Sequence, residues 1–80
     1  MQNTTVLSKL TEGERGRVLS VDPALRPTTD RLGLIPGTEV LCLRRCPLGD
    51  PAVYWFRSTA LALRAGDAEG ITLALTPNTG

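Results

Sequence analysis

Glycine and proline residues divide this chain of 80 residues into short segments, and this punctuation limits what it can fold into. Eight glycines and six prolines are spread along it, mostly between runs of valine, leucine and alanine. Small all-β domains typically have short apolar runs with turn residues between them. The runs recur every 8 to 12 positions or so, which is about one strand length plus a turn. We therefore expect a mainly β fold of about five strands, over residues 17–21, 38–43, 52–57, 60–63 and 71–75.

Two short helical turns are expected between these strands. Thr28 or Thr29 can cap the first turn, and Gly33 stands where a left-handed residue ends a helix. A second, polar turn or loop is expected at 65–69. The Pro-Gly pair at 36–37 predicts a type II β-turn, because proline presets φ at the second position and glycine accepts a positive φ at the third.

The length of the chain allows one small domain, since domains usually contain about 50 to 250 residues. We expect this domain over residues 6–76, with a flexible polar leader at 1–5 and a tail at 77–80. The apolar run Val6–Leu10 is expected to pack across one mouth of the fold. Because a small open sheet leaves two edge strands exposed, we expect the strands to close into a small β-barrel.

Charge and composition exclude several classes of function. Nine basic and eight acidic residues leave a net charge of +1, which argues against a dedicated nucleic-acid-binding protein. The chain has no histidine, so it lacks the commonest general base and the commonest transition-metal ligand. No serine has a histidine partner, and no glycine-rich loop opens a helix to bind phosphate. We expect a non-enzymatic protein with no catalytic residue, no metal ligand and no cofactor.

Cys42 and Cys46 are the two cysteines of the chain. If Cys42 lies in an extended run, the spacing places the two Cα atoms roughly 10 to 13 Å apart. A disulfide needs less than about 7 Å, so we interpret both as reduced thiols, acting as small buried apolar side chains in a reducing, cytoplasmic environment. No apolar run approaches the roughly 18 residues of a membrane-spanning helix, so no direct membrane insertion is expected.

Strand phase places an apolar cluster on the outer side of the predicted sheet. Arg57 marks the outer side of strand 52–57, and Val53 and Trp55 share that side because side chains alternate along a strand. Glu39 marks the outer side of strand 38–43 in the same way. The outward residues of that strand are Leu41 and Leu43, and its inward residues are Val40 and Cys42.

This outer cluster is the candidate protein-interaction surface. Exposed apolar clusters often mark binding surfaces, and tryptophan beside arginine is the composition of many interface hot spots. The candidate residues are Leu41, Leu43, Val53, Trp55 and Arg57, with Arg44 and Arg45 from the loop that follows the second strand. Two alternatives stay open: Val6–Leu10 covers this face, or a β-bulge reverses the phase of a strand.

Several segments, taken with their spacing, resemble one protein family. Arg31–Val40 ends in the letters PGTEV, Arg44–Pro51 resembles an APLGDP loop with Cys46 in the place of alanine, and Leu61–Arg64 resembles an IALR strand. Leu7–Val21 and Ile71–Leu75 fit the opening and the close of the same pattern. Over nearly its whole length the chain resembles the ferrous iron transport protein A (FeoA) domain, an SH3-like small barrel.

The resemblance implies a cytoplasmic accessory protein of bacterial ferrous iron uptake. Such a protein is expected to contact the cytoplasmic part of the FeoB-type membrane GTPase that transports the iron, and no catalytic residue carries over. Three alternatives remain: a regulatory module related to the C-terminal domain of metal-dependent repressors, a direct carrier that binds a transition metal ion through Cys42 and Cys46, and a nucleic-acid-binding barrel. A homo-oligomer using the apolar face is the simplest other outcome.

Overall fold

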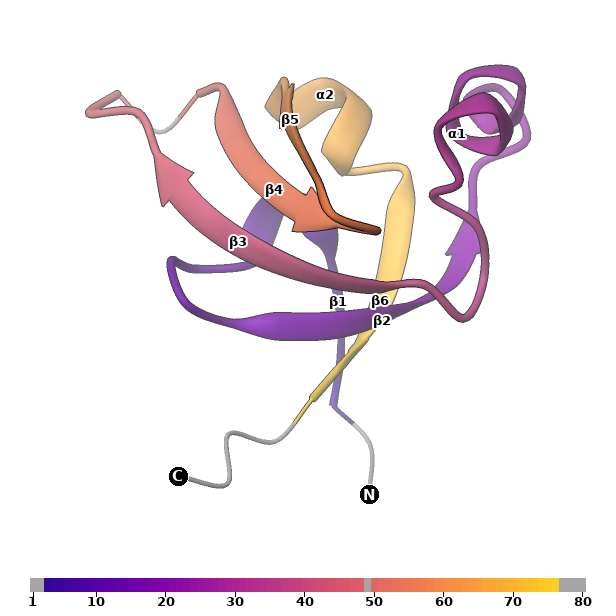
Figure 1. The fold of residues 1–80 in the computed structure, drawn as a ribbon, viewed down its shortest axis with the longest axis horizontal. Coiled ribbons are helices and arrows are strands. Elements are labelled where there is room, and N and C mark those ends of the chain that lie inside the picture. The colour runs from indigo at the N-terminus through magenta and orange to yellow at the C-terminus, as the bar shows by residue number, and fades with distance from the viewer. Residues whose placement is uncertain (1–2, 49, 77–80) are drawn as a thin grey trace.

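All five expected strands are present in the structure, a computed structural model that describes residues 3–48 and 50–76 (Figure 1). The elements in chain order are β1 (Thr4–Val6), the 3₁₀ helix η1 (Leu7–Lys9), β2 (Arg15–Val21), α1 (Arg26–Leu32), β3 (Glu39–Arg45), β4 (Ala52–Phe56), β5 (Thr59–Leu63), α2 (Ala65–Ala68) and β6 (Ile71–Leu75).

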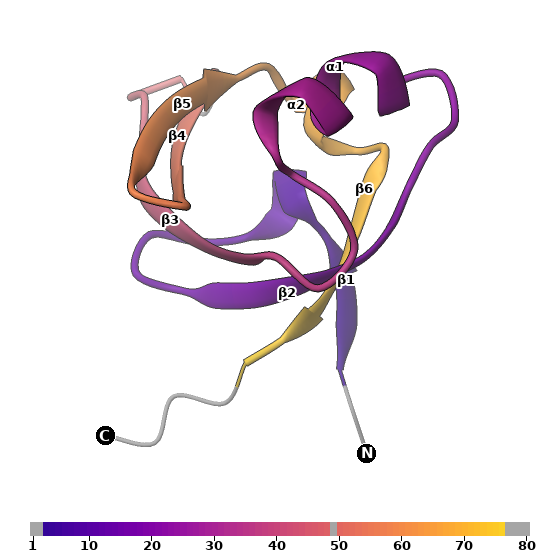
Figure 2. The ribbon, with the colours of Figure 1, turned by 45° about the vertical axis from the view of Figure 1, so that its right-hand side comes forward.

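The strands form one antiparallel sheet in the order β1-β6-β2-β3-β4-β5. The sheet is strongly curved, and α1 and α2 lie at the same end of the molecule (Figures 1 and 2). The expected mainly β architecture is confirmed, with six strands in the described part of the chain. The expected closure is not observed, because β1 and β5 stand at the two ends of the strand order and do not pair with each other.

The additional strand, β1, joins the end of the expected leader, residues 4–5, to the first residue of the expected domain. Residues Thr4–Val6 of β1 pair with residues 72–74 of β6. Three residues are too few to show an alternating pattern, so the pairing with β6, about 70 positions later in the chain, is what makes this segment a strand. Residues 1–2 and the expected tail at 77–80 lie outside the described residues.

The core lies on the inner side of the curved sheet. Leu7, the first residue of η1, and Leu10, which follows η1, are fully buried in the core. The hydroxyl of Tyr54 donates to the carbonyl oxygen of Leu7 at 3.3 Å. The segment Val6–Leu10 therefore packs against the core through Leu7 and Leu10. The core residues are Leu7, Leu10, Val18, Leu34, Val40, Cys42, Ala52, Tyr54, Phe56, Ala68, Ile71 and Leu73.

The helix α1 begins earlier than its threonines predict. Its N-cap is Leu25, which makes no side-chain capping bond, so the expected capping by Thr28 or Thr29 is wrong. Thr29 is buried inside the helix, where its hydroxyl donates to the carbonyl oxygen of Leu25 at 3.2 Å. The helix ends as expected, at Gly33 with a left-handed φ of 81°, and Gly37 has the positive φ of the predicted turn.

Candidate functional site

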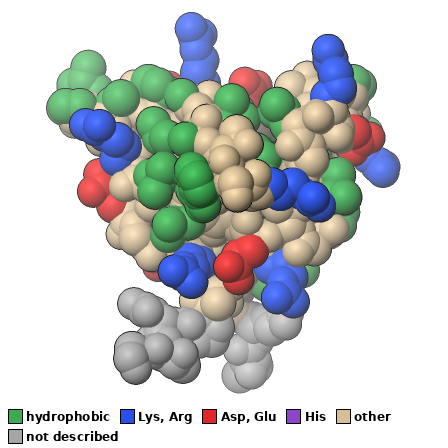
Figure 3. Space-filling model, in the orientation of Figure 1, with side chains coloured by type: hydrophobic (Ala, Val, Ile, Leu, Met, Phe, Trp, Pro, Cys, Tyr) green, Lys and Arg blue, Asp and Glu red, His purple; other side chains and the backbone are tan. Residues whose placement is uncertain are grey.

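Leu41 and Trp55 stand directly opposite each other on β3 and β4, on the outer side of the sheet. Trp55 is 43% exposed, and Leu41 and Val53 on the same side are half-buried. The inward partners are buried, so the phase predicted for these strands is confirmed up to Cys42. Figure 3 shows hydrophobic side chains gathered over this part of the molecule, with charged side chains around them.

The apolar surface continues onto β5. Ala60 is paired with Trp55 and Ala62 with Val53, and both alanines are exposed. Since paired residues share a face of the sheet, the two alanines lie on the outer face with Trp55 and Val53. Arg44, which is paired with Val53, lies on the same face at the end of β3. We call Leu41, Val53, Trp55, Ala60 and Ala62 the outer apolar face. The segment Val6–Leu10 does not cover it, because Leu7 and Leu10 are buried in the core on the other side.

A β-bulge in β3 changes the direction of the side chains after Cys42. The register with β4 shifts between Cys42 and Arg44, and both Leu43 and Arg44 are exposed. Arg45 then pairs with the buried Ala52, which places it on the inner side of the sheet. A bulge was one of the two alternatives left open by the sequence, and here it affects the last residues of the strand.

Arg45 therefore lies on the inner side of the sheet at the end of β3, and not in a surface loop beside the candidate interaction surface as we expected. Its Nε donates to the carbonyl oxygen of Leu10 at 3.0 Å, and its Nη2 donates to the carbonyl oxygens of Leu10 and Ser8. Its main-chain N–H donates to a carboxylate oxygen of Glu12 at 2.9 Å. These bonds connect β3 to η1 and to the segment after it, so Arg45 stabilises the fold beneath the outer face instead of contributing to that face.

Arg57 links the β4–β5 turn to the end of α1. Its Nε donates to the carbonyl oxygen of Gly33 at 2.9 Å, although the residue remains exposed. A Cβ atom at Gly33 would lie 2.9 Å from Cδ of Arg57, so glycine gives this side chain the space it needs. Arg57 thus holds a fixed position next to Trp55.

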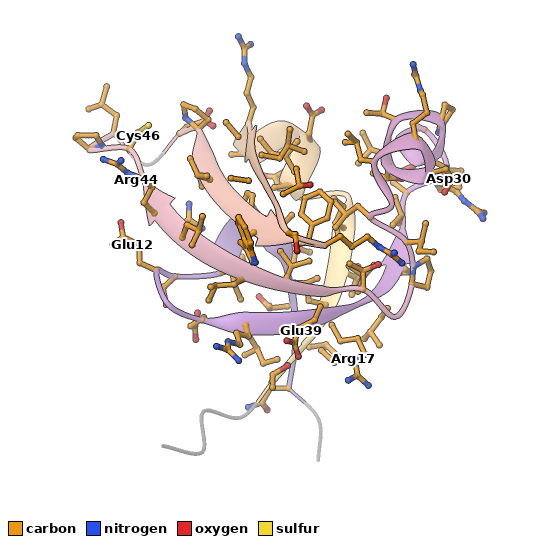
Figure 4. All side chains as sticks on the ribbon, viewed as in Figure 1. Glu12, Arg17, Asp30, Glu39, Arg44 and Cys46 are labelled. Atoms are coloured by element: carbon orange, nitrogen blue, oxygen red, sulfur yellow. The ribbon has the colours of Figure 1, made fainter. Side chains whose placement is uncertain are left out.

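An open groove of about 510 Å³ runs beside Trp55. Its walls combine the indole of Trp55 and the side chain of Leu41 with charged groups from β2, β3 and the β4–β5 turn. Figure 4 shows that Glu39 and Arg17 lie near each other at the β2–β3 side, whereas Arg44 and Cys46 lie together at the far end of β3. The residues that line the groove are Arg15, Gly37, Thr38, Glu39, Leu41, Trp55, Phe56 and Arg57.

The two cysteines have opposite environments, and both are free thiols. Cys42 is fully buried, and this burial raises the pKa of its thiol above the ordinary value of 9.0. Burial likewise raises the pKa of the Tyr54 hydroxyl above 10.0. Cys46 is exposed, which corrects the expectation of two buried thiols. Among residues 3–48 and 50–76, no three His, Cys, Asp or Glu side chains gather as a metal-ion site.

Three exposed residues, Leu48, Ala60 and Ala62, were not singled out by the sequence analysis. Leu48, in the loop after β3, is 95% exposed between Pro47 and a glycine. Ala60 and Ala62 join the outer apolar face, but small side chains carry no signal of their own. Strand pairing is the only indication that they belong there.

None of the helices in the described part of the chain has the length and apolar character needed to cross a membrane.

Comparison with known proteins agrees with this architecture. The model of the FeoA domain family matches residues 5–75. The chain is 37% identical to a FeoA protein from Chlorobium tepidum, with a TM-score of 0.83 and coverage of 95% of this chain and 74% of that one. It is 27% identical to the zinc complex of Stenotrophomonas maltophilia FeoA, a prokaryotic SH3 domain protein, with a TM-score of 0.76 and coverage of 86% and 88%.

The same fold occurs in part of a larger regulator. A manganese-dependent transcriptional repressor is 16% identical, with a TM-score of 0.82, and the match covers 95% of this chain but 44% of that one. At this identity the likeness shows the fold alone. No curated protein sequence matches the chain. The family match over nearly the whole chain and the 37% identity to a solved FeoA protein lead to one conclusion: the chain belongs to the FeoA family and has its SH3-like fold.

Proposed function

We propose that this protein is a cytoplasmic, non-enzymatic accessory protein of bacterial ferrous iron uptake, which acts by contact with the cytoplasmic part of a FeoB-type membrane GTPase. Family membership supports the link to iron transport. The related Stenotrophomonas maltophilia protein has been put forward as a ferrous iron transport activating factor. The contact surface in this proposal is the outer apolar face, with Leu43, Arg44 and Arg57 at its margin.

The pairing of Trp55 with Leu41 on an uncovered sheet face is the observation that carries this proposal. Trp55 has nearly half of its surface exposed to water, which is unfavourable for a large aromatic side chain. A partner that buries this surface would gain the corresponding free energy. Tryptophan and arginine are the residues most enriched at interface hot spots. Here the indole and Arg57 lie on the same groove, and the bond to Gly33 holds the guanidinium in position.

The charges around the groove indicate the chemistry of the partner surface. Arg15 and Arg57 line it, and Arg44 is exposed at the end of β3, whereas Glu39 is the single carboxylate in the lining. A complementary surface would present an apolar centre with acidic groups around it. Such pairing accelerates association and selects the partner more than it adds affinity, so binding should weaken moderately as the salt concentration rises.

The test is a titration of the isotope-labelled protein with the purified cytoplasmic part of the permease, followed by amide NMR. We expect shifts at Leu41, Val53 and Trp55, and a Trp55→Asp variant should bind at least about 30-fold more weakly, the loss typical of a hot spot. Leu19→Asp is the matched control, because Leu19 is also 43% exposed but does not line the groove.

The same two variants belong in an iron uptake assay in cells that lack the native protein. We expect Leu19→Asp to restore uptake and Trp55→Asp to fail, with both proteins folded and present at equal levels. Full uptake with a folded Trp55→Asp variant would rule out this face as the contact surface. Shifts confined to residues far from β3 and β4 would do the same.

A further inference from the structure

Strand β5 ends the sheet on one side. Its only partner in the described part of the chain is β4 (Figure 2). Ala60 and Ala62 are exposed. Natural proteins usually protect such an edge with proline, lysine, an inward charge or a covering element. The β5 sequence, Thr-Ala-Leu-Ala-Leu, has neither proline nor charge. The edge therefore lacks the side-chain features that normally prevent another strand from pairing with it.

The hairpin geometry shows which main-chain groups face outward. Phe56 and Thr59 flank a two-residue turn in which Arg57 and Ser58 both have positive φ, the pattern of a type I′ turn. The residues that flank such a turn exchange both hydrogen bonds, and bonded and non-bonded pairs then alternate along the hairpin. Leu61 and Leu63 consequently bond to β4, whereas the N–H and C=O groups of Ala60 and Ala62 point away from it.

Nothing in the described part of the chain hydrogen-bonds to these outward groups. Ala60 and Ala62 thus offer two donors and two acceptors in a row, spaced for an added strand. Their methyl side chains leave room for a second backbone to approach. An added strand would also extend the outer apolar face, because its residues opposite Ala60 and Ala62 would lie on the side of Trp55 and Val53.

The charges at the two ends of β5 differ. Arg57 precedes the strand, held by its bond to Gly33. The nearest carboxylate before β5 in the chain is Asp50, and the nearest one after it is Asp67. Both lie at the other end of the strand, since Asp50 accepts a bond from the N–H of Ala65 and Asp67 belongs to α2. In space, Arg15 and Glu39 line the same groove as Arg57, so two cations and one carboxylate leave the beginning of β5 net cationic. The end of β5, where Arg64 is exposed, has charges of both signs.

We propose that β5 binds an extended segment of a partner protein as an added antiparallel strand, and that this segment has acidic residues at its C-terminal end. Antiparallel addition matches every other pair in the sheet and places the C-terminal end of the added strand beside Arg57. A second copy of β5 would bring its own Arg64 to that position, where two cations repel each other. This inference does not depend on the identity of the partner proposed above.

The probe is a synthetic peptide, acetyl-Thr-Val-Thr-Val-Thr-Glu-Glu-amide, with the reversed placement Glu-Glu-Thr-Val-Thr-Val-Thr as its charge control. In the free protein we expect the amides of Ala60 and Ala62 to exchange quickly with solvent and those of Leu61 and Leu63 slowly. A saturating amount of the first peptide should slow exchange at Ala60 and Ala62 by about tenfold or more. The reversed peptide should bind about three- to tenfold more weakly.

The matched variants are Ala62→Pro and Ala62→Val. Proline removes the outward N–H but no bond to β4, and edge strands tolerate proline at such a position. Valine keeps the N–H with a similar volume. We expect Ala62→Val to keep peptide binding and Ala62→Pro to lose it, with the signals of β4 unchanged in both variants.

Three results would overturn the proposal. Equal binding by both Ala62 variants would show that the edge hydrogen bonds are not used. Absence of peptide-dependent protection at Ala60 and Ala62 would show that the edge does not accept a strand of this chemistry. Protection that increases with protein concentration alone would assign the edge to a second copy. Both Ala62 variants keep Trp55, so the failure of strand addition at β5 is distinguishable from the failure of partner binding at the outer apolar face.

Discussion

Arg45 on β3 and Leu10 after η1 are 35 positions apart in the chain, yet Nε of Arg45 donates to the carbonyl oxygen of Leu10 at 3.0 Å. The same guanidinium reaches the carbonyl oxygen of Ser8. One side chain therefore provides hydrogen bonds to two main-chain acceptors at a helix end, where intrahelical partners are lacking. The bulge in β3 makes this contact, because it turns Arg45 inward opposite Ala52.

Replacing Arg45 should lower the stability of the fold. Arg45→Ala leaves the carbonyl groups of Ser8 and Leu10 without their donor, so we expect a loss of about 2 kcal/mol in the free energy of unfolding. Urea unfolding measures it. Arg44→Ala is the control, because Arg44 is exposed and should change stability by less than about 0.5 kcal/mol. Equal losses in the two variants would contradict a supporting role for Arg45.

Replacing Ser58 with glycine should stabilise the protein. Ser58 has a φ of 61° in the β4–β5 turn, a region that costs an L-residue roughly 1 kcal/mol and costs glycine almost nothing. We expect Ser58→Gly to raise the free energy of unfolding by about 0.5 to 1 kcal/mol. Ser58→Ala removes the hydroxyl but keeps the Cβ atom, so it should show no gain. A gain of the same size in both variants would point to the hydroxyl instead of the backbone.

The two thiols should differ sharply in reactivity. Cys46 is exposed in the loop after β3, while Cys42 lies fully buried in the core. A disulfide-exchange reagent should therefore modify one thiol quickly in the native protein and the second only as the protein unfolds. Mass spectrometry after digestion identifies the modified residue. Rapid modification of Cys42 under native conditions would mean that the strands around it open far more often than the packing suggests.

Alkaline pH should destabilise the protein partly through Cys42. Burial raises the pKa of its thiol in the folded state, so the folded protein holds this proton more tightly than the unfolded chain does. The corresponding stability is fully present below pH 9.0, the ordinary value, and is lost as the pH rises from there through the raised pKa. One pH unit above 9.0, the resulting decrease in the free energy of unfolding is at most about 1.4 kcal/mol.

Two cysteine variants separate this effect from other titrations. Cys42→Ala should be less stable at pH 7 because of the lost packing, but its stability should fall less steeply between pH 8 and 10 or so, the range in which an exposed thiol ionises. Cys46→Ala is the matched control, because it also removes one thiol but leaves the packing of the core unchanged. Tyr54, whose pKa burial also raises, leaves some alkaline destabilisation in every variant. Parallel profiles for wild type and Cys42→Ala would refute the assignment.

Much of the candidate site could be predicted from alternation alone. Glu39 and Arg57 mark the outer side of two neighbouring strands, and this was sufficient to place Leu41, Val53 and Trp55 together. The prediction was wrong for Arg45, because a bulge adds one residue to a strand without a recognisable sequence signal. The sheet edge at Ala60 and Ala62, which pairs with no second strand among residues 3–48 and 50–76, was also not predicted, because alternation shows a strand but not its neighbours.

The sequence by itself determined the features that depend on local backbone chemistry. Glycine accepts a positive φ at 33 and 37, and period-two alternation separates the inner from the outer side of each strand. Only the tertiary structure decided that Thr4–Val6 forms a strand, that Arg45 turns inward and that β5 pairs with no strand except β4 among the described residues. These outcomes depend on pairing between residues distant in the chain, which no local preference encodes.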